Sequence, residues 1–313
     1  MSARELRAQR ARGAPRRTYA CLEGRGRKPT DYEITTTALL YYPPRGFEVE
    51  TPVWRHHQAY QLGGKLSCAD WDAFEDPRHT TYSSYVAARR DQEALLDHLF
   101  ASPPAAVSAG LARLAELVSA LRFPLHGLQM VSSYVGALAP SGRIAVVAAL
   151  QGADEVRRIQ RLCQWLARSG APLVELDRAG RALWQEHRAL QPLRRVIERL
   201  LVTYAWEEAL VGLNGVLKPA LEQVLGERLG AVAARHGDQL LGGCVRSFAA
   251  DAAWHAACYE QLERLLTEGN ARNAEVLGGM KQQLKHAIFE ACEAAATLLE
   301  SSHGEGGKRD DTV

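Results

Sequence analysis

The chain has 313 residues, of which 47% are hydrophobic and 24% are charged, and its formal net charge is +2. That length can build one large domain or two smaller ones, each with a substantial core. No apolar run approaches the roughly 18 residues that a membrane-spanning helix needs, so the composition excludes a transmembrane protein and favours a soluble globular one.

The first 28 residues are strongly basic, although the chain as a whole is nearly balanced. They contain nine Arg or Lys residues against only Glu5 and Glu23. An Arg-rich, acid-poor start is typical of transit peptides and of arms that bind nucleic acids. We favour a third interpretation, in which residues 1–28 form a flexible basic arm that becomes ordered on a partner.

Six cysteines are scattered along the chain, without a Cys-x-x-Cys pair, a zinc-like spacing or a secretory signal. Most lie in apolar stretches with a helical pattern, where cysteine is usually a small core residue. This usage favours the reducing environment of the cytoplasm.

Residues 29–75 lack the pattern of regular helix. Pro43 and Pro44 oppose helix formation in a segment rich in aromatic residues, and no alternating strands follow that would form a sheet. We therefore expect an extended arm that lies across a partner subunit or across another part of the same chain. The glycine-rich, charged tail over 301–313 is expected to be disordered.

From Asp76 onward the sequence predicts one helix after another. Asp76 can cap a helix and Pro77 suits a first helical turn, which predicts a helix to about residue 100. Proline and glycine punctuation predicts further helices over about 104–121, 124–138, 143–168, 180–189, 192–217, 219–235, 238–267 and 271–300. The expected fold is all-α, with a helical domain over 76–300.

Glu155 lies on the predicted core face of the helix over 143–168. At helical spacing it shares a stripe with Gly152, Ile159 and other apolar residues, so its carboxylate should point inward. In helical bundles that hold two irons, a Glu-x-x-His pair presents a carboxylate and an imidazole one turn apart. Here the third residue after Glu155 is Arg158, which has no lone pair for a metal but can neutralise the carboxylate.

The other ligands of a di-iron bundle are also missing from the sequence. Such a centre takes two Glu-x-x-His pairs and one further Glu from each of two other helices. Of the ten histidines only His303 has Glu three residues before it, and this Glu300-x-x-His303 pair lies at the start of the tail, outside the helical body. On the helix predicted over 238–267, Ala252 stands at the position of the second Glu. On the helix predicted over 124–138, Ser133 stands at the position of another ligand. The residues left for a metal are Glu155, Glu208 and His255, too few for two irons.

Several blocks of the sequence carry a family resemblance in combination. They are Lys28-Pro29-Thr30-Asp31-Tyr32-Glu33-Ile34, Trp71-Asp72-Ala73-Phe74 with Asp76-Pro77 and Tyr82-x-x-Tyr85, His126-Gly127-Leu128-Gln129-Met130 with Ser133-Tyr134-Val135, Tyr204-Ala205-Trp206-x-Glu208-Ala209, Leu217-Lys218-Pro219, and Asp251-Ala252 with His255. With these blocks the chain resembles the beta subunit of the hydroxylase component of bacterial multicomponent di-iron monooxygenases, in the toluene, isoprene and alkene group.

The resemblance implies a ferritin-like, ribonucleotide-reductase-like bundle that binds no cofactor itself. The di-iron centre would lie in a partner alpha subunit, and the complete hydroxylase would be an α2β2γ2 assembly. That assembly would receive electrons from NADH through a reductase, often by way of a Rieske ferredoxin, and would bind an effector protein. It would insert one atom of O2 into aromatic or alkene hydrocarbons. The degenerate metal positions would be Ser133, Glu155, Arg158, Glu208, Ala252 and His255. The implied contacts with a partner subunit are Tyr32, Trp71, Phe74, Asp76 and Tyr82.

Two other functions stay open from the residues alone. One is a stand-alone metal-carboxylate enzyme built on Glu155, Glu208 and His255, which would bind metal without a partner. The other is a helical nucleic-acid binder that uses the basic arm, with an affinity that falls steeply with salt. The lack of Glu-x-x-His pairs inside the helical body counts against the enzyme. The lack of a helix-turn-helix or aromatic RNA-binding signature counts against the binder.

Overall fold

The computed structural model describes residues 30, 32, 55–56, 58–62, 64–101 and 109–301. Every regular element in these ranges is a helix and none is a strand, so the predicted all-α class is confirmed for the described part. The predictions for residues 1–28, for most of the arm over 29–63 and for the tail after Ser301 lie outside the described residues.

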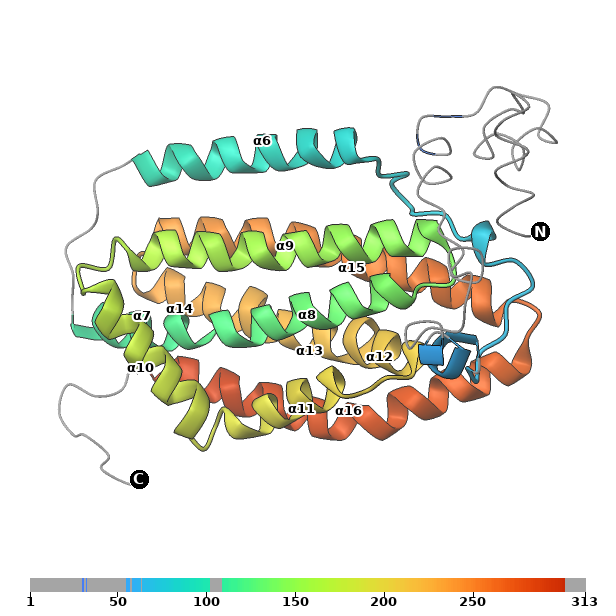
Figure 1. Cartoon of the computed structure of the whole chain (residues 1–313). Helices are drawn as coiled ribbons and strands as arrows, with labels where there is room; N and C mark the ends of the chain where they lie inside the picture. Colours follow the sequence, from blue (N-terminus) through green and yellow to red (C-terminus); the bar gives the residue numbers. More distant parts are fainter. Residues whose placement is uncertain are drawn as a thin grey trace.

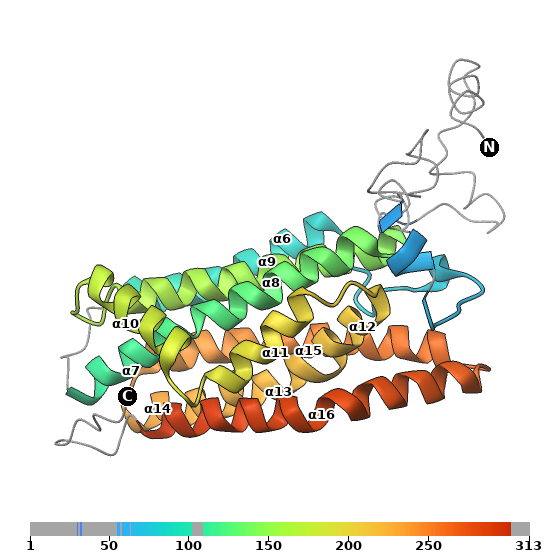
Figure 2. The same ribbon diagram turned by 60° about the horizontal axis from the view of Figure 1, so that its bottom comes forward.

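The long helices form a bundle. They are α6 (Tyr82–Ala101), α7 (Ala109–Ala120), α8 (Arg122–Leu138), α9 (Gly142–Leu166), α10 (Leu173–Glu186), α11 (Gln191–Leu201), α15 (Gln239–Thr267) and α16 (Ala271–Glu300). In this bundle α8 and α9 run side by side, while α6 lies against α15 and α10 against α7 (Figure 1, Figure 2). No helix in the described ranges is both long enough and apolar enough to cross a bilayer.

Short connections with local caps turn the chain between paired helices. Ser141 lies between α8 and α9, and its hydroxyl accepts a hydrogen bond from the Arg143 amide. Between α15 and α16, Gly269 has a φ of 69°, a conformation that costs glycine little, and the Asn270 side chain then caps α16. These turns make both pairs antiparallel.

The segment from Trp206 to Arg235 is one continuous helical path through the centre of the bundle. It consists of α12 (Trp206–Leu210), the π-helix η4 (Val211–Leu217), α13 (Lys218–Glu222), the π-helix η5 (Gln223–Arg228) and α14 (Leu229–Arg235). The predicted break at Pro219 is therefore wrong. Proline removes one backbone donor, and the wider π turns on either side let the helix continue past it.

Three other predicted boundaries are also corrected. Helix α6 begins at Tyr82 and not after Asp76, because His79 has a left-handed φ of 48° that interrupts the path. Helix α10 begins at Leu173, directly after Pro172, seven residues before the predicted start. The helix predicted over 192–217 ends at Leu201 and resumes at Trp206.

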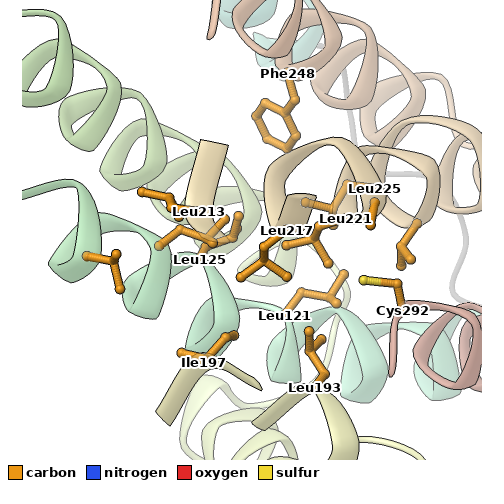
Figure 3. Packing of buried hydrophobic residues seen from close by; sticks show 14 of the residues in the cluster. Leu121, Leu125, Leu193, Ile197, Leu213, Leu217, Leu221, Leu225, Phe248 and Cys292 are labelled. Carbon is orange, nitrogen blue, oxygen red and sulfur yellow. The ribbon is translucent and has the colours of Figure 1, made fainter. Parts of the chain in front are cut away.

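Apolar side chains from helices far apart in sequence fill the centre of the bundle (Figure 3). The labelled residues come from the α7–α8 junction, α8, α11, the central segment, α15 and α16: Leu121, Leu125, Leu193, Ile197, Leu213, Leu217, Leu221, Leu225, Phe248 and Cys292. Burial of this surface is the main favourable term for folding. The core fixes the helices from which the polar groups described next project.

The described part of the arm lies on the chain's own helices. It contains the π-helical turn η2 (Gln58–Leu62) and the 3-10 turn η3 (Trp71–Ala73). The Ser67 backbone exchanges hydrogen bonds with the Asn273 side chain of α16, and the Trp71 ring meets the Trp206 ring edge to face at 5.6 Å. The described part of the arm thus contacts another part of the same chain, and its contact with a partner subunit stays a prediction.

Candidate functional site

Helix α9 turns its charged side chains into the protein and its small, uncharged side chains outward. All six charged residues of α9 are buried: Arg143, Asp154, Glu155, Arg157, Arg158 and Arg161. Its exposed residues are Ala149, Ala153, Val156 and Gln160. Charged groups are rarely buried unless they are paired. Arg143 pairs with Glu75, and the partners of the other five come from α6, the central segment, α15 and α9 itself.

Glu155 is fully buried, so its predicted inward direction is confirmed. Arg158 Nη1 lies 3.5 Å from Glu155 Oε2, and Lys218 Nζ lies 3.4 Å from Glu155 Oε1. Burial by itself would raise the pKa of Glu155, but Arg158 and Lys218 outweigh it and hold the pKa below the ordinary value. The carboxylate is therefore ionised, and this chain supplies its counter-charges.

Lys218 brings an amino group into the centre of this cluster. Its side chain is only 8% exposed, and its Nζ lies 3.1 Å from Gln151 Oε1 and 3.3 Å from His255 Nδ1. Glu155 Oε1, at 3.4 Å, forms an ion pair with the same nitrogen but no hydrogen bond. Burial lowers the pKa of Lys218, and the neighbouring Glu155 carboxylate opposes that effect.

His255 joins the cluster to a second carboxylate. Its Nε2 lies 3.0 Å from Asp154 Oδ2, while its Nδ1 faces the Lys218 amino group. Because Nδ1 accepts from Lys218, the proton of the neutral ring resides on Nε2 and is donated to Asp154. Burial and the nearby Lys218 lower the pKa of His255 well below 6.5, so the ring stays neutral at physiological pH.

Helix α6 closes the other side of the cluster. Arg89 contacts Asp154 through two nitrogens at 2.9 Å each, and the Tyr85 hydroxyl donates to the same carboxylate at 2.7 Å. Arg89 also pairs with Asp251 on α15, whose other oxygen lies 3.6 Å from Arg157. Burial raises the pKa of both Asp154 and Asp251, with the arginines acting against it.

The remaining predicted metal positions, Ser133, Ala252 and Glu208, add no donor atom to this cluster. Ser133 is exposed on α8, where it accepts a hydrogen bond from Gln129, and Ala252 is half-buried on α15. Glu208 is paired with Lys65 at 2.7 Å beside an open pocket of about 130 Å³ between α11 and α16. Glu208 therefore does not join Glu155 and His255, because its side chain is 37% exposed and paired with Lys65, whereas those two are buried.

Sequence reasoning missed Lys218, Asp154 and Asp251 as members of the cluster. One signal was present for Lys218, a lysine inside an apolar helical run between Leu217 and Ala220. Asp154 and Asp251 each stand next to a residue that was singled out, Glu155 and Ala252. A helical wheel does not show which of two adjacent residues reaches the cluster when the side chains of both are covered, as they are for Asp154 and Glu155.

The residues present do not fit a di-iron centre. Within the described ranges, no group of three or more His, Cys, Asp or Glu side chains is arranged to hold a metal ion. Glu155 and His255 are the two predicted ligands that do lie together, and the Lys218 amino group lies against both of them. The Arg158 guanidinium contacts the other oxygen of Glu155. A further cation there would face charge repulsion.

Three of the five predicted subunit contacts are buried inside this chain. Tyr32, Phe74 and Asp76 are 4%, 2% and 0% exposed, which leaves no side-chain surface for a partner. The Asp76 carboxylate instead accepts hydrogen bonds from the Trp254 indole and the Thr80 amide, so it is an internal anchor and not a helix cap. Only Tyr82, which is 70% exposed, and the half-buried Trp71 remain available, and their role at an interface stays a prediction.

Comparison with known proteins gives a consistent result. Residues 45–269 match the family model described as methane/phenol/alkene hydroxylase. The chain is 29% identical over 307 residues to the hydroxylase component subunit beta of the toluene-4-monooxygenase system of Ectopseudomonas mendocina, covering 92% of this chain and 91% of that relative.

Solved structures agree with this match. A chain of toluene 4-monooxygenase with toluene bound in the resting active site superimposes with a TM-score of 0.78 at 27% identity, covering 92% of this chain and 98% of that one. A chain of xenon-pressurised phenol hydroxylase from Pseudomonas sp. OX1 has a TM-score of 0.75 at 16% identity over 91% and 90% of the two chains, which supports the fold alone. The hydroxylase-type all-α fold expected from the sequence is confirmed.

Proposed function

Because this chain belongs to the methane/phenol/alkene hydroxylase family, we propose that it is the structural, non-catalytic beta subunit of a multicomponent monooxygenase. In this proposal a partner alpha subunit holds the di-iron centre, which supplies the activation of O2 for insertion of one oxygen atom into an aromatic or alkene hydrocarbon. NADH provides electrons through a reductase, with or without a Rieske ferredoxin. A gamma subunit completes an α2β2γ2 hydroxylase in the cytoplasm, to which an effector protein binds.

The observation that carries the non-catalytic role is the filled site around Glu155. Its carboxylate already has Arg158 at 3.5 Å and Lys218 at 3.4 Å as counter-ions. The His255 imidazole is occupied at both nitrogens, by Lys218 and Asp154. Groups that are satisfied within the chain have little to offer a redox metal, which supports locating the iron in the partner. The similarity to a subunit named beta of a toluene hydroxylase supports the subunit role.

The outer face of α8 and α9 is the surface we propose for the partner. Residues 122–166 are all described, and the eight exposed ones among them include no Asp, Glu, Lys or Arg: His126, Met130, Ser133, Ala137, Ala149, Ala153, Val156 and Gln160. They recur at helical spacing on both helices, which run side by side. A broad uncharged face is unusual on a protein in which 24% of residues are charged, and such faces mark interaction sites.

The proposed role is tested by measuring iron and size for this chain purified alone and after co-expression with the other hydroxylase subunits. Iron should be found only in a larger complex and on a different polypeptide. If this chain alone held stoichiometric iron, and lost it in Glu155→Ala or His255→Ala, the stand-alone metal enzyme would be the better assignment.

A second experiment tests the docking face. Val156→Glu places a charge at the centre of the uncharged face, where the wild-type side chain is 50% exposed. It should reduce co-purification of the partner at least tenfold without lowering the chain's own melting temperature. Val174→Glu is the matched control, because Val174 is 72% exposed on α10, outside the face. Equal loss with both variants would contradict the assignment of the face.

A further inference from the structure

The donor atoms around Lys218 Nζ are those that a divalent metal would use. Gln151 Oε1, Glu155 Oε1 and His255 Nδ1 lie within 3.1 to 3.4 Å of that nitrogen. A carbonyl oxygen, a carboxylate oxygen and an imidazole nitrogen form a mixed O/N set of the kind that binds Co²⁺ or Zn²⁺. These atoms converge on one point, and the ammonium occupies it.

The orientation of His255 also matches that of a metal ligand. Its Nε2–H donates to Asp154 Oδ2 at 3.0 Å, so the lone pair of Nδ1 points at the centre of the cluster. In metal sites a carboxylate commonly fixes a ligating histidine in the same way, by accepting from the ring nitrogen that does not bind the metal. Asp154 is itself held in place by Arg89, whose Nε lies 2.9 Å from Asp154 Oδ1.

Glu155 provides a second, independent sign. It is fully buried, and its Oε1 atom accepts no hydrogen bond from any described residue. The atom is balanced only by charge, with Lys218 Nζ at 3.4 Å and His255 Nδ1 at 3.8 Å. A buried carboxylate oxygen without a hydrogen bond is costly unless a cation stands in front of it.

We propose that the Lys218 ammonium is a built-in cation that takes the place of a metal ion, so that Gln151, Glu155 and His255 form a latent divalent-metal site which opens when Lys218 is shortened. The inference concerns this chain's own residues and does not depend on the proposed subunit role, which is tested on the wild-type protein. Replacing Lys218 with serine leaves the cluster one positive charge short and vacates the space of the ammonium and of three methylene groups.

The test measures Co²⁺ bound to the full-length chain after incubation with the metal and gel filtration, by elemental analysis and by the visible absorption of the ion. Lys218→Ser should retain about one Co²⁺ per chain, with a spectrum that indicates oxygen and nitrogen ligands. The wild type should retain less than about a tenth as much. Lys285→Ser removes an exposed lysine of α16 and is the matched control. It should behave as the wild type does.

The double variant Lys218→Ser with Glu155→Gln distinguishes the latent site from adventitious binding. It should lose the Co²⁺ that the single variant retains. A folded Lys218→Ser chain without Co²⁺, or equal Co²⁺ in the single and double variants, would refute the proposal.

If Lys218→Ser folds poorly in metal-free medium, soluble yield becomes the readout. Co²⁺ in the growth medium should restore the yield to the wild-type level, whereas Mg²⁺, which prefers an octahedral shell of oxygen atoms, should not. A yield that stays low with Co²⁺ would equally refute the proposal.

Discussion

Replacing Asp76 with alanine tests whether the segment before α6 is anchored inside this chain. The carboxylate accepts hydrogen bonds from Trp254 Nε1, the Thr80 amide and the Arg78 amide, each at 2.9 Å. Water can replace the acceptor for the exposed Arg78, but not for the buried Trp254 and Thr80 groups. Leaving a buried donor without a partner costs about 1–3 kcal/mol, so the two together should lower the free energy of unfolding by about 2–6 kcal/mol.

The assay is thermal unfolding followed by circular dichroism. At about 2 °C per kcal/mol for a chain of this size, Asp76→Ala should lower the melting temperature by roughly 4–12 °C. Asp76→Asn keeps one acceptor oxygen, so its melting temperature should lie between those of the wild type and Asp76→Ala. The control is Asp91→Ala, since Asp91 is 76% exposed in a surface pair with Arg90, and its removal should change stability by less than about 0.5 kcal/mol.

Two outcomes would refute this reasoning about Asp76. One is a melting temperature for Asp76→Ala within the range of Asp91→Ala. The other is an unchanged melting temperature together with loss of partner subunits from the complex, which would return Asp76 to the interface predicted from the sequence.

Three further predictions concern titration, packing and the arm. Burial raises the pKa of Glu222 to about 6 from 4.5, so the folded state binds that proton more tightly than the unfolded state does. Stability from this group is present at low pH and lost as the pH rises through about 6. Glu222→Gln should therefore remove a decrease of up to about 2 kcal/mol between about pH 4.5 and 6 in denaturant titrations. A Cβ at Gly180 would lie 2.8 Å from the α7 backbone, so Gly180→Ala should destabilise by about 1–3 kcal/mol. Gly278→Ala, where a Cβ meets nothing within 4 Å, should be neutral or stabilising by up to about 1 kcal/mol, and equal effects would contradict the packing. Trp71→Ala removes an aromatic contact with Trp206 worth about 0.5–1.5 kcal/mol, so limited proteolysis should cut residues 64–75 faster than in the wild type; an unchanged rate would count against that contact.

Helical periodicity was enough to predict the long helices and the inward direction of Glu155. Asp238 and Asn270 mark helix starts through caps that involve only near neighbours, and the structure has α15 and α16 within a residue of the prediction. Local signals of this kind depend on a few adjacent residues and so can be read from one sequence.

The composition of the cluster could not be predicted in the same way. Lys218 and Glu155 are 63 residues apart in sequence, so only the packing of the central segment against α9 brings them together. The π-helices before and after Lys218 and Pro219 change the phase of the helix. A prediction of the buried face from sequence periodicity assumes that this phase is constant. Asp76 was misassigned for a related reason: its cap-like position suited a local role, while its partner Trp254 lies on a distant helix.

Helix α6 shows how a mostly exposed element can control the interior. Of its 20 residues only Leu96 is buried, so apolar contact contributes little to its attachment. What holds it is Tyr85, Arg89 and Glu93, which reach the charges of α9 and α15. If α6 detached, water would enter and rehydrate those charges, and the centre of α9 would lose its protection from amide exchange at the same time. Docking of α6 and dehydration of the interior ions are therefore one cooperative event in folding.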